Sequence, residues 1–324
     1  NLFKMLNNFI KIVERENLFN FDRSNYLRLD ANERVAPFSK KDLINLKKLI
    51  SNYNIQAYPT KRNQVVDKIS KKYNIKKKNL SLMPGADSVL KYLFEIISKK
   101  KGNVLTIYPT YGMIDVYSKI YKKKLVKISD ENTILFKKKS IYRNITMVYL
   151  AYPNMPSGKL IENDLLNFVL NFTNKKKIPL IIDEAYIDYS SKISNCSKIN
   201  KYKNLVVIKT FSKFYGLAGL RLSFIASHYK NILAFDTIRP PHDVGLLNLE
   251  ILNYFLSKKK DNYLNNIKKS RKIIERWCKF LNLKYQMTEA NFFHIFFEKK
   301  NISKIVKYLF KKKILVKSSK TINR

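Results

Sequence analysis

The feature that most restricts the fold is an alternation of short, mostly apolar runs with helical patterns between residues 80 and 226. Such runs occur at 104–107, 147–150, 179–182 and 205–208. Strands that alternate with helices predict a parallel sheet with helices on both faces. The sequence therefore predicts an α/β fold with a mostly parallel central sheet.

The pattern changes after His228, where strand-like and helical segments follow a long helical stretch and predict a smaller α+β domain. At the other end, residues 1–20 carry apolar residues at helical spacing and predict a docking helix. We therefore expect three parts: an N-terminal arm with part of the small domain (1–45), a large sheet domain (46–229) and a small C-terminal domain (230–324).

The formal net charge of +40 raises the question of an anionic partner such as nucleic acid or a membrane surface. The lysines, however, occur as scattered doublets and triplets in loops and at element ends, and no stripe of them is interleaved with aromatic residues. This distribution favours a solvated surface. We expect no nucleic-acid partner and no membrane partner.

Cysteine and histidine usage bears on metals and on the compartment. Cys196 and Cys278 lack metal-site spacing and are expected to be free thiols in a reducing compartment, and with only 3 histidines no metal site is predicted. The first residues lack the apolar core of a signal peptide, and no apolar run reaches the length of a membrane span. These observations predict a cytoplasmic protein.

Polar residues follow two of the apolar runs at the point where each predicted strand ends. Asp183 and Tyr186 follow the run 179–182, and Lys213 follows the run 205–208. Ligands of open α/β sheets bind at these carboxyl ends of strands. An amine that forms a Schiff base and a carboxylate for a pyridinium nitrogen are requirements of pyridoxal phosphate.

Each of these side chains is suited to one part of that cofactor. Lys213 is suited to form the Schiff base and to move the α-proton. Asp183 is suited to the pyridine nitrogen, although a carboxylate at a strand end is also a helix cap. Tyr186 is suited to the ring's phenolic oxygen, and an interfacial tyrosine is the alternative.

A second group of residues is suited to the phosphate and to the face of the ring. Arg221 and Ser212 offer a guanidinium fork and a hydroxyl for a phosphate. The turn at residues 84–88 leads a strand into a helix, and backbone amides at a helix start bind anions, although many helices start in this way. Tyr111 is suited to stack on the ring; packing is its alternative role.

Ordered motifs extend this pattern over nearly the whole chain, and with them the chain resembles the histidinol-phosphate aminotransferase family of fold-type I pyridoxal-phosphate enzymes. In chain order these motifs are Leu29-Asp30-Ala31-Asn32-Glu33, Tyr58-Pro59, Pro84-Gly85-Ala86-Asp87, Pro109-Thr110-Tyr111-Gly112-Met113, Pro153-Asn154-Met155-Pro156-Ser157-Gly158, Asp183-Glu184-Ala185-Tyr186 and Thr210-Phe211-Ser212-Lys213 through Arg221. Together they are specific for the superfamily and less so for the substrate.

The resemblance implies further roles. The backbone amides of Ala86 and Asp87 would hold the phosphate, and Asn154 would share the phenolic oxygen with Tyr186. Tyr58 would reach the phosphate of a neighbouring subunit in a homodimer. The segment around Asn32 would close over the substrate.

The chain departs from the family at positions that bear on the cofactor and the substrate. The family's paired asparagines read Asn154 and Met155 here, and we assign the ring contact to Asn154. His242 and Gly245 replace a tyrosine and an asparagine in a loop that borders the substrate. The sequence ends at Arg324, before the family's last arginine-bearing strand, so either it is a fragment or the group that holds the substrate anion is altered.

The implied function is transamination in histidine biosynthesis, from glutamate to a keto acceptor such as imidazole acetol phosphate. The alternatives are another aminotransferase or a phosphothreonine-type decarboxylase on the same scaffold, and a basic nucleic-acid-binding protein without catalysis. The cofactor motifs do not distinguish the implied transamination from another reaction on the same scaffold. Against a nucleic-acid-binding protein stand Lys213, Asp183 and Arg221, which are all present.

Overall fold

The structure is a computed structural model that describes residue 13 and residues 21–51, 56–258 and 263–318. The docking helix predicted over residues 1–20 therefore lies outside the described residues. Among the helices of the described ranges, none is both long and apolar enough to cross a bilayer.

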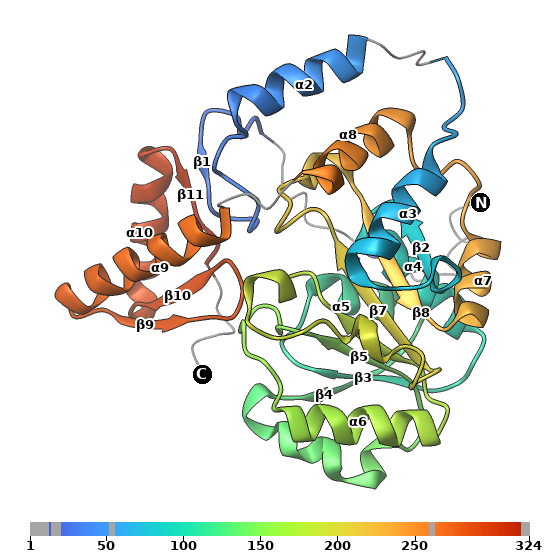
Figure 1. Ribbon diagram of the computed structural model, residues 1–324. Helices are drawn as coiled ribbons and strands as arrows, with labels where there is room; N and C mark the ends of the chain where they lie inside the picture. Colours follow the sequence, from blue (N-terminus) through green and yellow to red (C-terminus); the bar gives the residue numbers. More distant parts are fainter. Residues whose placement is uncertain (1–12, 14–20, 52–55, 259–262, 319–324) are drawn as a thin grey trace, which may run out of the picture.

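A seven-stranded sheet with the order β2-β8-β7-β6-β5-β3-β4 forms the centre of the molecule (Figure 1). Only β8 runs against its neighbours, because it pairs antiparallel with both β2 and β7. The prediction of a mostly parallel sheet is confirmed. The strands are β2 (Leu80–Met83), β3 (Asn103–Ile107), β4 (Leu125–Ile128), β5 (Ile145–Ala151), β6 (Leu180–Asp183), β7 (Leu205–Thr210) and β8 (Ser223–Ser227).

Helices cover both faces of this sheet. Because successive side chains of a strand point to opposite faces, each buried strand contributes to two hydrophobic layers. One layer packs against α3 (Arg62–Tyr73), α6 (Asn163–Lys175) and α8 (Leu246–Ser257). The other packs against α4 (Ala86–Ser98), α5 (Gly112–Ile120) and α7 (Tyr229–Ile238).

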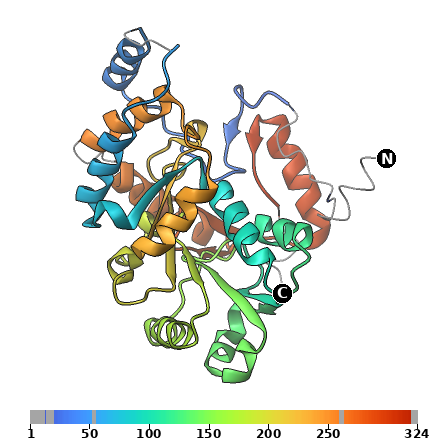
Figure 2. The same ribbon diagram turned by 90° about the vertical axis from the view of Figure 1, so that its right-hand side faces the viewer.

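A smaller group of elements lies beside the sheet (Figures 1 and 2). An antiparallel pair of strands is accompanied there by two helices, and the short β1 (Leu27–Arg28) pairs parallel with β11 (Ile314–Leu315). The N-terminal part of the chain thus joins the C-terminal part. The helices of this group are α9 (Tyr263–Phe280) and α10 (Lys299–Lys311), and its antiparallel strands are β9 (Lys284–Met287) and β10 (Phe293–Phe296). Helix α2 (Lys40–Ser51) contacts α8.

Helix α7, which starts directly after His228, was not identified in the sequence analysis. Its apolar residues Ile232 and Phe235 are buried against the central sheet, as are Leu249 and Leu252 of α8. Packing against the sheet stabilises both helices. For α7, the local periodicity of the sequence alone does not indicate a helix. We therefore propose that the smaller part begins with α9, and not near residue 230 as the sequence analysis expected.

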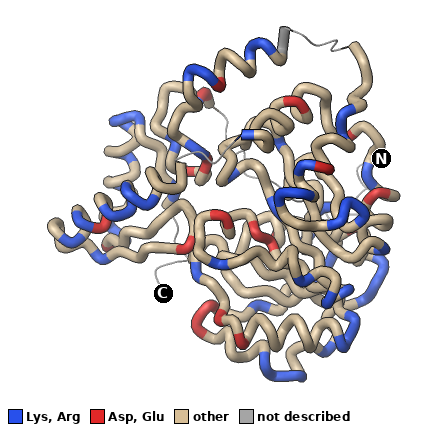
Figure 3. Tube along the Cα trace, in the orientation of Figure 1, with Lys and Arg blue, Asp and Glu red and all other residues tan. Residues whose placement is uncertain are grey.

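Lysine and arginine residues are spread along the described trace from α2 to α10 (Figure 3). Acidic residues are fewer, at 24 against 64 basic residues in the whole sequence. The absence of a nucleic-acid partner stays a prediction.

Candidate active site

The predicted site residues come from the carboxyl ends of adjacent parallel strands. Asp183 is the last residue of β6 and lies in register with Ala151 of β5 and Ile208 of β7. Lys213 follows the end of β7 by one short turn. Parallel strands end at the same edge of a sheet, so the fold brings this carboxylate and this amine to one side of the molecule.

Asp183 is a buried carboxyl group with two hydrogen-bond donors. The Tyr149 hydroxyl donates to Oδ2 at 2.9 Å, and the Ala185 amide donates to Oδ1 at 3.1 Å. Burial raises the pKa of Asp183 to about 6, although both donors lower it. Within the described ranges no lysine or arginine forms an ion pair with this carboxylate. A cationic group of a ligand placed beside Asp183 would therefore stabilise its ionised form.

This shifted pKa predicts a pH-dependent stability of the cofactor-free protein. The folded carboxyl has a pKa of about 6 against an ordinary 3.8, so the folded state holds the proton more strongly. Its contribution is fully present below pH 3.8 and is lost as the pH rises through about 6. At about 1.4 kcal/mol per pKa unit the loss is about 3 kcal/mol. Urea unfolding at pH 4 and pH 7 should show this fall in wild type relative to Asp183→Asn; equal falls would contradict the prediction.

The start of α4 is the predicted phosphate-binding turn. Gly85 precedes the helix with φ of 88° and ψ of 155°, and no side chain caps the helix start. The first amides of a helix lack intrahelical acceptors, so those of Ala86 and Asp87 are suited to an anion. A Cβ at Gly85 would lie 3.2 Å from Nη2 of Arg221, which shows how closely the guanidinium approaches this turn.

Asp87 joins the two other predicted residues at this end of the site. Its Oδ2 accepts from Nη2 of Arg221 at 3.0 Å, and its Oδ1 accepts from the Tyr111 hydroxyl at 2.7 Å. Burial and the Asp87 carboxylate both raise the pKa of Tyr111, so the phenol stays protonated. The carboxylate thus orients an aromatic ring and a guanidinium beside the uncapped helix start.

Replacement of Gly85 by alanine should disturb this turn. The glycine occupies a backbone region that side chains strongly disfavour, so we expect Gly85→Ala to lower the free energy of unfolding by about 1–3 kcal/mol. It should also weaken binding of inorganic phosphate and of pyridoxal phosphate, because the new Cβ displaces Arg221. Gly219→Ala is the matched control, since no atom lies within 4 Å of a Cβ there. Equal effects of the two substitutions on stability and binding would contradict the prediction.

Lys213 lies beneath the segment that the sequence analysis expects to close over the substrate. Its Nζ donates to the Ala31 carbonyl oxygen at 2.8 Å and lies 5.6 Å from the centre of the Tyr186 ring. Nδ2 of Asn32, a residue with φ of 54°, donates to the Tyr186 hydroxyl at 3.1 Å. Nδ2 of Asn291 donates to the Asn32 carbonyl oxygen at 3.0 Å, so the β9–β10 connection also holds this segment.

The side-chain amide of Asn154 makes its hydrogen bonds within the loops around it. Its Nδ2 donates to the Pro109 carbonyl at 3.2 Å, to Oδ1 of Asp130 at 3.1 Å and to Oγ of Ser157 at 3.2 Å. The neighbouring Met155, by contrast, packs in the cluster around Tyr186, and its sulfur lies 4.0 Å from Nδ2 of Asn32. The contact between Asn154 and the ring's phenolic oxygen stays a prediction.

Two further predicted residues occupy different surroundings. Ser212 is buried, and its amide donates to Oγ1 of Thr210 at 3.1 Å. Tyr58 is 75% exposed and stacks on His242 with ring centres 4.7 Å apart. Among the described residues the ring contact of Tyr58 is with His242, and its reach into a neighbouring subunit stays a prediction.

Sequence reasoning missed Tyr149, Ala31 and Asn291. A tyrosine within a fully buried strand carries a hydroxyl that needs a partner, and this is the signal by which Tyr149 could have been found. The Ala31 carbonyl and Asn291 have no such signal, because they reach Lys213 and Asn32 only through tertiary contacts.

The polar groups of the candidate site fit pyridoxal phosphate. The buried Asp183 carboxylate suits a pyridinium, the Lys213 amine suits an aldehyde, and the uncapped start of α4 with Arg221 suits a phosphate. Fold and site together define a pyridoxal-phosphate-dependent enzyme of fold type I. The family model described as aminotransferase class I and II matches residues 16–320. The chain belongs to this family and is a pyridoxal-phosphate-dependent aminotransferase.

Individual relatives agree with this assignment. Histidinol-phosphate aminotransferase from Flavobacterium johnsoniae is 30% identical over 294 residues, which cover 86% of this chain and 77% of that protein. Dihydroxyacetone phosphate transaminase from Campylobacter jejuni is 28% identical over 322 residues, covering 93% and 84%. The crystal structure of histidinol-phosphate aminotransferase from Sinorhizobium meliloti in complex with pyridoxal-5'-phosphate has the same fold, with a TM-score of 0.79, 20% identity and coverage of 92% and 84%.

Proposed function

We propose that this aminotransferase moves an amino group from glutamate to a phosphate-bearing keto acceptor such as imidazole acetol phosphate, in histidine biosynthesis. The observation that carries the chemistry is the convergence of Lys213, Asp183 and the Arg221-flanked start of α4 on one sheet edge. The substrate class is supported by the relatives, since two that are named for different reactions are both named for phosphate compounds.

The protein's own side chains would divide the work. When bound, pyridoxal phosphate supplies a ring that withdraws charge from the substrate's α-carbon. Asp183 would keep the pyridine nitrogen protonated, and Lys213 would carry the α-proton. The Tyr186 hydroxyl accepts from Asn32, which leaves its own proton for the ring's phenolic oxygen. Arg221 and the Ala86 and Asp87 amides would hold the phosphate, and the Tyr111 ring would stack on the cofactor.

The substrate alternative is another aminotransferase or a phosphothreonine-type decarboxylase on the same scaffold. The sheet edge and the cofactor residues serve either reaction, so they do not discriminate between them. The products do: a transaminase converts glutamate to 2-oxoglutarate, and a decarboxylase releases carbon dioxide.

A donor and acceptor screen tests the proposed function. Purified full-length protein with pyridoxal phosphate should convert glutamate to 2-oxoglutarate over many turnovers only when a phosphorylated keto acceptor is present. Imidazole acetol phosphate and dihydroxyacetone phosphate should be compared directly, with the unphosphorylated ketones as controls. Equal rates with phosphorylated and unphosphorylated acceptors would refute the proposed substrate class.

We also propose a homodimer in which Tyr58 reaches the neighbouring site. The support is the 75% exposure of Tyr58, which leaves the side chain accessible to a second subunit although its ring stacks on His242. Sedimentation of the full-length protein and mixed dimers of Tyr58→Phe with Lys213→Ala would test the shared site. A cytoplasmic location stays a prediction.

A further inference from the structure

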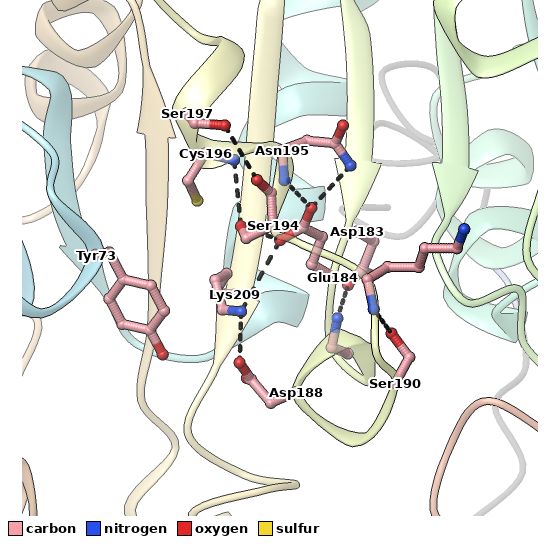
Figure 4. Close-up of polar contacts among 12 residues, drawn as sticks. Tyr73, Asp183, Glu184, Asp188, Ser190, Ser194, Asn195, Cys196, Ser197 and Lys209 are labelled. Carbon is pink, nitrogen blue, oxygen red and sulfur yellow. Dashed lines mark hydrogen bonds and ion pairs between the residues drawn. The ribbon is translucent and has the colours of Figure 1, made fainter. Parts of the chain in front are cut away.

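A buried ion-pair network lies next to the proposed site, at the ends of strands β6 and β7. Lys209, the penultimate residue of β7, is 1% exposed, and Glu184, which follows β6, is fully buried. Nζ of Lys209 donates to Oδ1 of Asp188 at 3.0 Å and lies 3.9 Å from Oε2 of Glu184. Figure 4 shows the ammonium between these two carboxylates. None of these three residues entered the cofactor assignment.

The network lies on the opposite face of the sheet from Asp183. Asp183 accepts from Tyr149, which belongs to the hydrophobic layer of α4, α5 and α7. Side chains alternate along a strand, so Glu184 and Lys209 point to the other layer. Lys209 accordingly lies 5.0 Å from the centre of the Tyr73 ring on α3. The ion pairs therefore join the ends of β6 and β7 on the face of the sheet opposite to Asp183.

The partners of Lys209 flank the predicted cofactor residues along the chain. Glu184 follows Asp183 directly, and its amide donates to the Ile208 carbonyl of β7 at 2.9 Å. Asp188 follows Tyr186 by two residues. A single ammonium group thus links the segment that carries Asp183 and Tyr186 to the strand that leads into Lys213.

Glu184 is anchored on its other side. Its Oε1 accepts from the Asn195 amide at 2.6 Å and from Nδ2 of Asn195 at 3.0 Å, and its Oε2 accepts from the Ser194 hydroxyl. Tyr73 extends the network in the other direction, because its hydroxyl lies 3.3 Å from that of Tyr215, two residues after Lys213. Burial lowers the pKa of Lys209, but the carboxylates of Asp188 and Glu184 raise it by more. The net shift is upward, so the lysine remains charged.

Stability alone does not account for a charged network at this place. A buried ion pair gains little over apolar residues of the same volume, because both charges lose their hydration. Such a pair does impose defined geometry, since each charge has to meet its partner at hydrogen-bond distance. We propose that Lys209 is a positioning residue of the active site, which sets the spacing of Asp183 and Lys213 through Glu184 and Asp188. This inference rests on the proposed cofactor roles of those two residues.

The test compares Lys209→Met with the conservative Lys209→Arg. In Lys209→Met the affinity of the cofactor-free protein for pyridoxal phosphate, titrated by absorbance, should fall about tenfold or more, because small displacements of reacting groups have large effects. The kcat should fall more than the KM for the amino donor rises. Lys209→Arg keeps the charge between the two carboxylates and should recover most of both. Lys258→Met is the control, since Lys258 pairs with the buried Asp42 between α8 and α2, away from the sheet edge.

Amide hydrogen exchange of the cofactor-free protein separates failure of this inference from failure of the proposed function. Exchange should accelerate in residues 183–190 and 210–216 of Lys209→Met, and not in those residues of Lys258→Met. This readout needs neither cofactor nor turnover. If Lys209→Met does not fold, Glu184→Gln with Lys209→Met removes both members of the pair and leaves no lone charge at Glu184. Unchanged exchange and cofactor affinity in a folded variant would overturn the proposal.

Discussion

Lys213→Ala is expected to abolish transamination, with a fall in kcat of about 10²–10⁴-fold from lost proton transfer alone. The Nζ of Lys213 is the amine at the sheet edge and donates to the Ala31 carbonyl at 2.8 Å beside the Tyr186 ring. Alanine removes both the nucleophile and the base. The measurement is single-turnover conversion of glutamate, together with the cofactor's absorbance band before and after borohydride reduction. Wild type should retain the reduced cofactor covalently, and Lys213→Ala should release it on denaturation.

Two control variants test whether the effect comes from the Lys213 amine itself. One keeps the positive charge at this position, and the other removes a different lysine. Lys213→Arg keeps a cation near Tyr186 but cannot link covalently to the cofactor, so it should lose as much activity as Lys213→Ala. Lys192→Ala removes an exposed lysine and should behave as wild type. Covalent retention of cofactor in Lys213→Ala would assign the amine to another lysine.

Asp183→Asn is expected to have the second largest effect on activity. Removing one partner of a buried charge pair costs about 3–5 kcal/mol. If Asp183 pairs with a cationic ring nitrogen, kcat should fall roughly 10²- to 4 × 10³-fold, at ~1.4 kcal/mol per tenfold. The asparagine still accepts from Tyr149, so the fold and the phosphate end should remain. The cofactor should therefore still bind, and its absorbance should report a changed ring protonation.

Asp115→Asn is the matched control for the carboxylate. Asp115 lies on α5 in a partly exposed pair with Lys127 at 3.4 Å, outside the sheet edge, so its kcat should match wild type. Wild-type kcat in Asp183→Asn would show that this carboxylate is a structural cap, the alternative that the sequence analysis left open.

Much of the fold follows from local sequence pattern. Short apolar runs and helical spacing predicted the strands and most helices of the central sheet, because burial of alternate or periodic side chains is what forms these elements. Helix α7 was missed because the burial of Ile232 and Phe235 depends on a sheet assembled from distant strands. The antiparallel direction of β8 likewise depends on pairing with β2 and β7.

The sequence by itself identified Lys213, Asp183, Tyr111, Arg221 and the turn before α4 as candidate site residues, because each follows a predicted strand. Only the tertiary structure decided which polar groups meet: Tyr149 with Asp183, Asp87 with Tyr111 and Arg221, and Lys213 with Ala31. It also turned the Asn154 amide toward Asp130. The physical reason is that a hydrogen bond requires close approach and correct direction between groups far apart in sequence, and neither follows from residue type or spacing.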